Sequence, residues 1–71
     1  MSTEILAPIA GKILEILVKE GDTVKGDDYV IKLDAMKMEN PVYAISDGIV
    51  QKINVKVGDE VEADDLLIVL N

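Results

Sequence analysis

Lys37 is the residue of this sequence whose type and neighbours best fit covalent chemistry. It lies between Met36 and Met38 in the stretch DAMKMEN, residues 34–40, near the middle of a chain of 71 residues. A lysine side chain carries a primary amine on a long stem, and the amine is a nucleophile once it has lost its proton. The plain interpretation is a solvated turn residue. The two flexible methionines favour a recognition surface instead, because exposed apolar side chains tend to mark interaction sites.

The composition excludes several other classes of chemistry. The sequence has neither cysteine nor histidine, which removes thiol nucleophiles, histidine bases, Ser-His-Asp triads and the usual zinc ligands. Its 14 carboxylates show no pattern that would bring two of them together in a pocket. We therefore expect no catalytic residue and no metal site in this chain.

The charge and hydropathy patterns restrict the kinds of partner that we expect for this chain. The formal net charge is −7, arginine is absent and the seven lysines are scattered, so nucleic acid is not an expected partner. No apolar run approaches the ~20 residues that span a bilayer, and no signal peptide is visible. The lack of cysteine fits a reducing compartment, and we expect a cytoplasmic protein that does not insert into a membrane.

An internal repeat organises the chain into two similar halves. A shift of 37 positions places residues 7–34 on residues 44–71 without a gap, and twelve of the 28 pairs are identical. Two copies are too few for a solenoid, so we expect two halves related by a pseudo-twofold axis, with residues 34–40 near their junction. The identical residues in the first copy are Ala7, Gly11, Ile16, Val18, Lys19, Gly21, Asp22, Val24, Asp27, Asp28, Ile31 and Leu33.

The residue pattern within the repeat indicates strands. In residues 50–57, VQKINVKV, the apolar Ile53, Val55 and Val57 alternate with polar residues, which is the period of a strand. Gly-Asp at 21–22 and 58–59 predicts turns. We therefore predict one all-β domain over residues 1–71, a flattened barrel or sandwich of two four-stranded antiparallel sheets (a barrel-sandwich hybrid). The runs on either side of Lys37 should pair as an antiparallel hairpin with a tight turn at Lys37 and its tip in water.

The central motif resembles the attachment motif of biotinyl domains, the biotin carboxyl carrier family. The resemblance consists of AMKM at 35–38, preceded by an acidic residue and followed by Glu-Asn. APIAGKI at 7–13 and DGIV at 47–50 resemble its flanks in biotin-dependent decarboxylases, transcarboxylases and acyl-CoA carboxylases, so the likeness covers about residues 4–70. Lipoyl domains share the fold but typically have Asp-Lys-Ala at the tip, so Met-Lys-Met favours biotin.

The resemblance implies a carrier rather than a catalyst. Lys37 would form an amide with biotin, made by a biotin protein ligase with ATP, and the ligase would read Ala35, Met36, Met38 and Glu39. The biotin would carry CO₂ as carboxybiotin between the active sites of a biotin-dependent carboxylase, decarboxylase or transcarboxylase. The implied partners are the ligase and the biotin carboxylase, carboxyltransferase or decarboxylase subunits, and the domain itself would be monomeric.

Two departures and two alternatives accompany this interpretation. Asp34 replaces the Glu that is usual before the motif, and the gap-free repeat leaves no room for the inserted thumb of some bacterial carriers. One alternative is a lipoyl carrier domain. The other is an unmodified β-sandwich interaction module whose tip binds a partner through its methionines.

Overall fold

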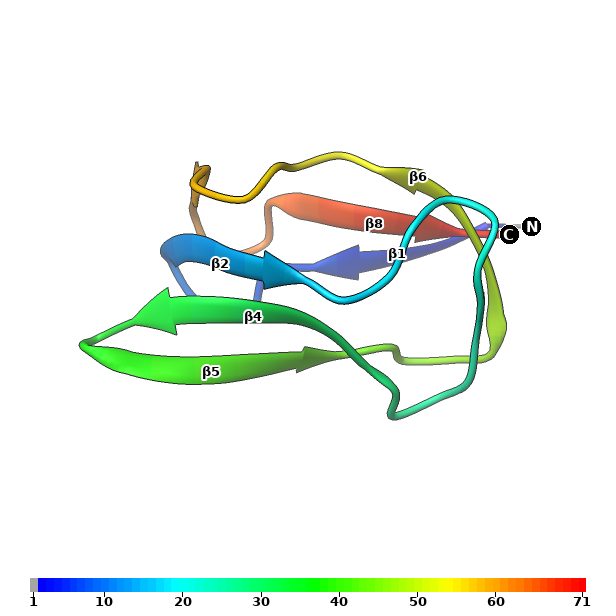
Figure 1. Ribbon diagram of the computed structural model, residues 1–71, viewed down its shortest axis with the longest axis horizontal. Helices are drawn as coiled ribbons and strands as arrows, with labels where there is room; N and C mark the ends of the chain where they lie inside the picture. The colour runs from blue at the N-terminus through cyan, green and yellow to red at the C-terminus, as the bar shows by residue number, and fades with distance from the viewer. Residues whose placement is uncertain (1) are drawn as a thin grey trace.

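The computed structural model describes residues 2–71 as two four-stranded antiparallel sheets that face each other (Figure 1). One sheet has the order β1-β8-β6-β3, and the other has the order β5-β4-β2-β7. The predicted all-β fold class is therefore confirmed. Met1, the first residue of the predicted 1–71 domain, lies outside the described residues. The strands are β1 (Thr3–Leu6), β2 (Gly11–Ile16), β3 (Thr23–Val24), β4 (Tyr29–Ala35), β5 (Met38–Tyr43), β6 (Gly48–Ile53), β7 (Glu60–Val61) and β8 (Leu66–Leu70).

The sequence repeat reappears in the order of the strands. A shift of 37 residues takes β2, β3 and β4 onto β6, β7 and β8, and each sheet contains strands from both halves. The correspondence also includes β1 and β5, which precede the two aligned segments and occupy equivalent edges of the two sheets. Their sequences share no identical residue, but Ile5 and Val42 occupy equivalent buried positions. The structural equivalence is thus longer than the sequence repeat.

The two Gly-Asp turns have the conformation that the sequence predicts. Gly21 and Gly58 have φ angles of 94° and 95°, a region that favours glycine because it lacks a Cβ. The carboxylates of Asp22 and Asp59 accept hydrogen bonds from the backbone N–H three residues earlier, at 3.0 and 2.9 Å. These local bonds set the same turn in both halves.

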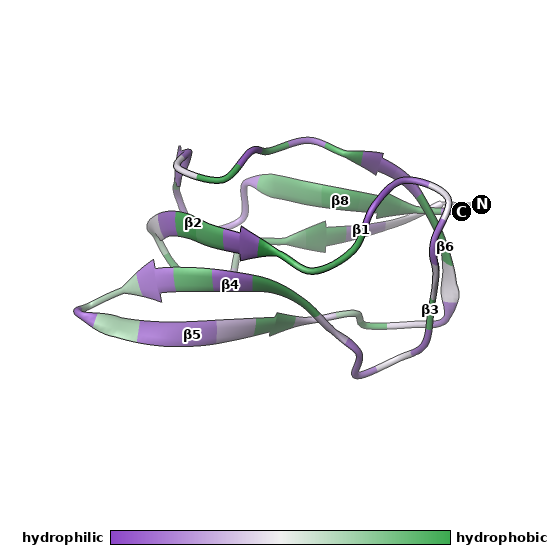
Figure 2. Cartoon of the chain, in the orientation of Figure 1, coloured by the Kyte–Doolittle hydropathy of each residue, from purple (hydrophilic) through white to green (hydrophobic). Residues whose placement is uncertain are grey.

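A purely aliphatic core joins the two sheets. Its side chains come from both sheets, and β8 is apolar along most of its length (Figure 2). Full burial of one such side chain contributes about 1.5–3 kcal/mol. Within residues 2–71 no charged or polar residue is buried, and no helix is long and apolar enough to cross a membrane. The largest fully buried side chains are Ile5, Ile13, Val30, Ile31, Leu33, Val50, Leu67, Ile68 and Leu70.

The β4–β5 hairpin reaches beyond this core. The molecule measures 33 × 18 × 17 Å, and the hairpin tip forms one end of its long axis while both termini lie at the other end (Figure 1). β5 is an edge strand, so Pro41 lies where a missing backbone N–H disturbs the sheet least. β2 pairs with β4 as far as Asp34, which lies opposite Lys12 and one residue before the last pair of the hairpin.

Gly11 sets how closely β2 can approach β4. A Cβ built on Gly11 would collide with the backbone carbonyl oxygen of Asp34 and lie 3.1 Å from the Cβ of Ala35. Because the first of these atoms belongs to the backbone, it cannot move aside as a flexible side chain would. Glycine at this position therefore lets β2 pack closely against the end of β4 that leads into the turn carrying Lys37.

We expect Gly11→Ala to lower the free energy of unfolding by about 1–3 kcal/mol, because the strands must separate to admit a methyl group. Urea denaturation measures the change. Gly26→Ala is the matched control, since its Cβ would meet nothing closer than 3.7 Å. It also corrects for the entropy that any glycine replacement removes from the unfolded chain. Equal stability of the two variants would contradict the proposed close approach.

Candidate functional site: the β4–β5 hairpin tip

The hairpin tip is a two-residue turn formed by Met36 and Lys37. Ala35 and Met38 are the last residues paired across β4 and β5. Met36 and Lys37 both have positive φ angles, 54° and 62°, which defines a type I′ turn. The predicted tight turn at Lys37 is confirmed, and the loop is one residue shorter than the Met-Lys-Met motif because Met38 begins β5.

This turn is built from residues that disfavour its backbone conformation. Type I′ turns usually contain Asn-Gly or Asp-Gly, whereas a residue with a full side chain pays about 1–2 kcal/mol in the left-handed region. Among residues 2–71, the other two non-glycine residues with positive φ are Asp27 and Asp64, both at 73° and at equivalent positions of the repeat. Aspartate tolerates that region better than methionine or lysine. The less tolerated cases therefore coincide with the motif, and such strain tends to collect at functional sites.

The two methionines frame Lys37 in solvent. Met36 is 80% exposed and Met38 is 66% exposed, so neither fills the core. Lys37 is also exposed, and both ion pairs found among residues 2–71 involve Lys32 instead. The amine of Lys37 is thus accessible from outside the domain. Of the other predicted recognition residues, Glu39 is exposed, whereas Ala35 is buried.

Asn40 bonds to the backbone on both sides of the turn. Its side-chain Nδ2 donates to the carbonyl oxygen of Ala35 at 3.2 Å and to that of Met38 at 3.1 Å. Ala35 ends β4 and Met38 begins β5, so one amide group joins the two strands at the point where the turn starts.

An ion-pair cluster centred on Lys32, in the middle of β4, joins three strands of the sheet. The Nζ of Lys32 on β4 lies 3.6 Å from a carboxylate oxygen of Glu15 on β2 and 3.7 Å from one of Glu39 on β5. The negative charge of Glu39, and then that of Glu15, raises the pKa of Lys32 above its ordinary value. Because the side chains are 30–67% exposed, solvent screens these attractions.

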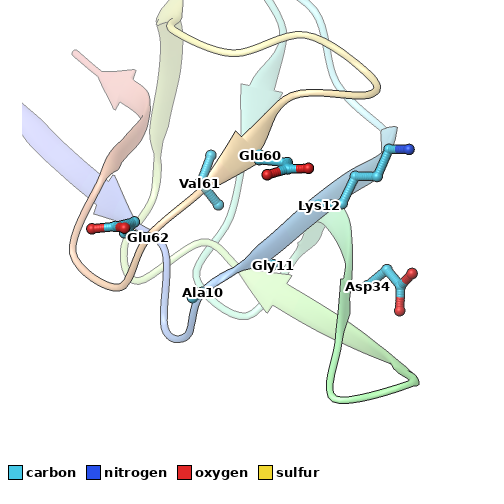
Figure 3. Close-up of a pocket in the computed structure, with 7 residues that line it drawn as sticks. All are labelled: Ala10, Gly11, Lys12, Asp34, Glu60, Val61 and Glu62. Carbon is cyan, nitrogen blue, oxygen red and sulfur yellow. The ribbon is translucent and has the colours of Figure 1, made fainter.

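A hollow beside the hairpin does not include the predicted site. It is open to solvent, has a volume of about 640 Å³, and brings together Lys12 on β2, Asp34 on β4 and Glu60 on β7 (Figure 3). None of the residues from Ala35 to Glu39 lines it. The candidate site is therefore a protrusion, which suits a group that must enter another protein's active site better than one that encloses a substrate.

Sequence reasoning missed two features of this site. Asn40 was part of the quoted motif, but its bonds depend on the fold of the turn. The Lys32 cluster depends on strand register, which shifts between Ile13 and Glu15 on β2. Only the Asn two residues after Met-Lys-Met offered a signal, since Asn often bonds to nearby backbone groups.

Comparison with known families matches residues 1–70 to the family described as "Biotin-requiring enzyme". The chain belongs to the family of biotin-requiring enzymes. Biotin as cofactor and the role of a carrier domain rather than a catalyst are thereby confirmed at the level of the family.

Three similar proteins of known identity have different names and lengths. The chain is 50% identical over 46 residues to the biotin-dependent acyl-coenzyme A carboxylase alpha3 subunit of Mycobacterium leprae, covering 65% of this chain and 8% of that subunit. It is 64% identical over 36 residues to the methylmalonyl-CoA carboxyltransferase 1.3S subunit of Propionibacterium freudenreichii, covering 51% and 29%. The biotinylated protein TB7.3 homolog of Mycobacterium leprae is 42% identical over 52 residues, 73% of each chain. The biotinyl domain thus spans only a small part of the first two relatives.

A solved structure contains the same fold. The urea carboxylase of Kluyveromyces lactis matches the whole of this chain with a TM-score of 0.94 and 37% identity, and the match covers 6% of that larger chain. A single-chain, multi-domain long-chain acyl-CoA carboxylase matches 96% of this chain with a TM-score of 0.89 and 26% identity, over 7% of its own length. In both proteins this fold is one small domain of a much longer chain.

The Lys32 cluster predicts how the stability of the biotinyl domain depends on pH. The pKa of Lys32 is raised in the folded state. The cluster therefore makes its full contribution to the free energy of unfolding below the ordinary lysine pKa of 10.5. This contribution is lost as the pH rises through the higher folded-state pKa. We expect the stability difference between the natural protein and Lys32→Gln to stay constant from neutral pH upward and to shrink above that value.

Chemical denaturation across the alkaline range measures this difference. Lys12→Gln is the control, because Lys12 is on the neighbouring strand β2 and takes part in neither of the two ion pairs of residues 2–71. If the difference in free energy of unfolding between the natural protein and Lys32→Gln did not shrink at alkaline pH, the ion pairs of Lys32 would not contribute to stability as expected.

Proposed function

We propose that Lys37 is the residue to which biotin is attached and that the domain carries a carboxyl group between active sites of a biotin-dependent enzyme. The observation that supports this most is the position of Lys37 at the apex of an exposed, strained type I′ turn, at one end of the long axis of the molecule. The family that the chain belongs to requires biotin, and Lys37 lies in the stretch that has no copy in either half.

The attachment needs a nucleophilic amine and an activated acid. A biotin protein ligase first joins biotin to AMP, releasing pyrophosphate from ATP. The Nζ of Lys37, once it has lost a proton, attacks the acyl carbon. A C–N amide bond forms, the acyl–phosphate bond breaks, and AMP leaves. Neither ion pair of residues 2–71 brings a carboxylate to the amine of Lys37, so its deprotonation would fall to the ligase.

The residues around Lys37 fit a group held away from the domain. The amine is free of the two ion pairs, and the tip stands clear of the hollow formed by β2, β4 and β7. When it is attached, biotin supplies the ureido nitrogen on which CO₂ is held and from which it is released. The domain supplies a folded base and a projecting arm, and so keeps a high effective concentration of cofactor near both active sites.

We propose that the ligase reads the tip through Met36, Met38 and Glu39, whose side chains are exposed. Ala35 is 4% exposed, so its contribution is through the shape of the strand end rather than through side-chain contact. Two adaptable methionines on either side of the reacting lysine give an apolar surface that can adjust to a pocket.

We further propose that residues 1–71 form one monomeric biotinyl domain whose sequence halves are about 7–34 and 44–71. Its partners would be the ligase and the biotin carboxylase, carboxyltransferase or decarboxylase parts of the enzyme. The relatives are subunits or chains of such assemblies, which supports this choice. The lack of cysteine in the sequence fits the reducing cytoplasm as its compartment.

We expect Lys37→Arg to abolish biotin incorporation, because the guanidinium remains protonated and is a poor nucleophile. Intact-mass measurement after co-expression with a biotin protein ligase should show one biotinyl group on the natural protein and none on the variant. Lys12→Arg, on the neighbouring strand β2, should incorporate biotin as the natural protein does. Incorporation by Lys37→Arg would reject the site, and a lipoyl mass on the natural protein would reject the function.

We expect Met36→Ala and Met38→Ala each to lower kcat/KM for biotinylation by about fivefold or more, which corresponds to an interface contact worth over 1 kcal/mol. Their free energies of unfolding should change by less than about 0.5 kcal/mol, since both side chains are on the surface.

Ile45→Ala is the matched control for the methionines. Ile45 is 69% exposed, close to the 66% of Met38, but it follows the end of β5 that is opposite the tip. Steady-state kinetics of biotinylation by the ligase, measured on the three variants, test whether the ligase reads the methionines. Equal effects at all three positions would mean that the ligase does not read the methionines.

A further inference from the structure

The type I′ turn of the tip lacks the residues that normally stabilise it. In most such turns the sequence places Asn, Asp or Gly within the loop, where positive φ is needed. Here the loop contains Met36 and Lys37, with φ of 54° and 62°, and the Asn lies outside it at position 40. Another interaction must therefore favour the left-handed conformation over the alternatives.

Asn40 provides that interaction by its geometry. A side-chain amide nitrogen has two hydrogens to donate, and the Nδ2 of Asn40 directs its bonds to Ala35 O at 3.2 Å and Met38 O at 3.1 Å. These two carbonyl groups belong to the residues that flank the loop on opposite strands. A single amide thus fixes the two ends of the turn relative to each other.

Asn40 is well placed to keep this role without contacting what binds the tip. It pairs with Leu33 across the hairpin, whereas the exposed methionines surround the apex. Its side chain is partly buried and directed to the backbone, not into the open hollow beside β7.

We propose that Asn40 is a positioning residue that holds the Met36–Lys37 turn in the conformation in which Lys37 accepts biotin. This inference rests on the proposed function of Lys37. If only a fraction f of the domain has the competent turn, the apparent KM for the ligase is divided by f, while kcat at saturation does not change. Loss of the Asn40 hydrogen bonds is therefore expected to raise KM for the ligase and to leave kcat unchanged.

The test compares Asn40→Ala and Asn40→Asp with the natural domain. Alanine removes both donors, and aspartate keeps the shape but also lacks them. Since the two lost hydrogen bonds together are worth about 1–3 kcal/mol, we expect KM to rise roughly fivefold or more in both variants with kcat retained. Ligase kinetics with the biotin-free domain as substrate give both constants.

Asn54→Ala is the matched control. The Nδ2 of Asn54 also donates to a backbone carbonyl, that of Leu66 at 3.3 Å, but far along the chain from the tip. It should leave KM unchanged. Thermal unfolding of all variants shows whether the effect at Asn40 comes from global loss of structure, and Asn40→Asp covers the case in which the alanine variant unfolds.

Backbone NMR shifts and three-bond couplings of Met36 and Lys37 measure the turn population in the absence of ligase. The inference requires that the population fall by the same factor by which KM rises. A higher KM with an unchanged turn would mean direct contact with the ligase and would overturn it, as would an unchanged KM. If the natural protein took no biotin, the proposed function would fail, while the NMR populations would still judge the role of Asn40 in the turn.

Discussion

Neither half of the chain can cover its own apolar face, and the burial of the two sheets against each other is the constraint on which the whole molecule depends. The sequence has no cysteine or histidine for a disulfide or zinc staple, and the core is made of Ile, Val, Leu and Ala alone. β4 and β8, which are inner strands of the two sheets, both contribute side chains to this core. Because β4 is anchored in this way, its last residue holds the turn that follows at a fixed position relative to the core.

The tip combines a strained turn with interactions that offset the strain. Met36 and Lys37 occupy a backbone region that neither favours, while Asn40, the Lys32 ion pairs and the close approach at Gly11 hold the strands on either side. With this arrangement the two loop residues can be of types that suit recognition, although those types disfavour the backbone conformation of the turn. It also explains why a hairpin without glycine can still be tight.

A carrier has to offer its reactive group to more than one active site, and the structure suits that task. The candidate lysine protrudes, its neighbours are exposed, and the hollow nearby is lined by other residues. The domain occupies 6–8% of several long relatives and structural neighbours, so it is used as one module among larger ones. This fits a group that moves between sites built elsewhere.

The sequence by itself determined the repeat, the all-β class, the Gly-Asp turns and the motif around Lys37, because local alternation and turn chemistry are written in adjacent residues. It could not show that β1 and β5 also correspond, because the two strands have no identical residue. Their equivalence is seen only in the burial of Ile5 and Val42 at matching positions. Nor could it show the bonds of Asn40 or the Lys32 cluster. Those depend on strand register and on the sign of φ at Met36 and Lys37, which only packing of the complete sheets decides.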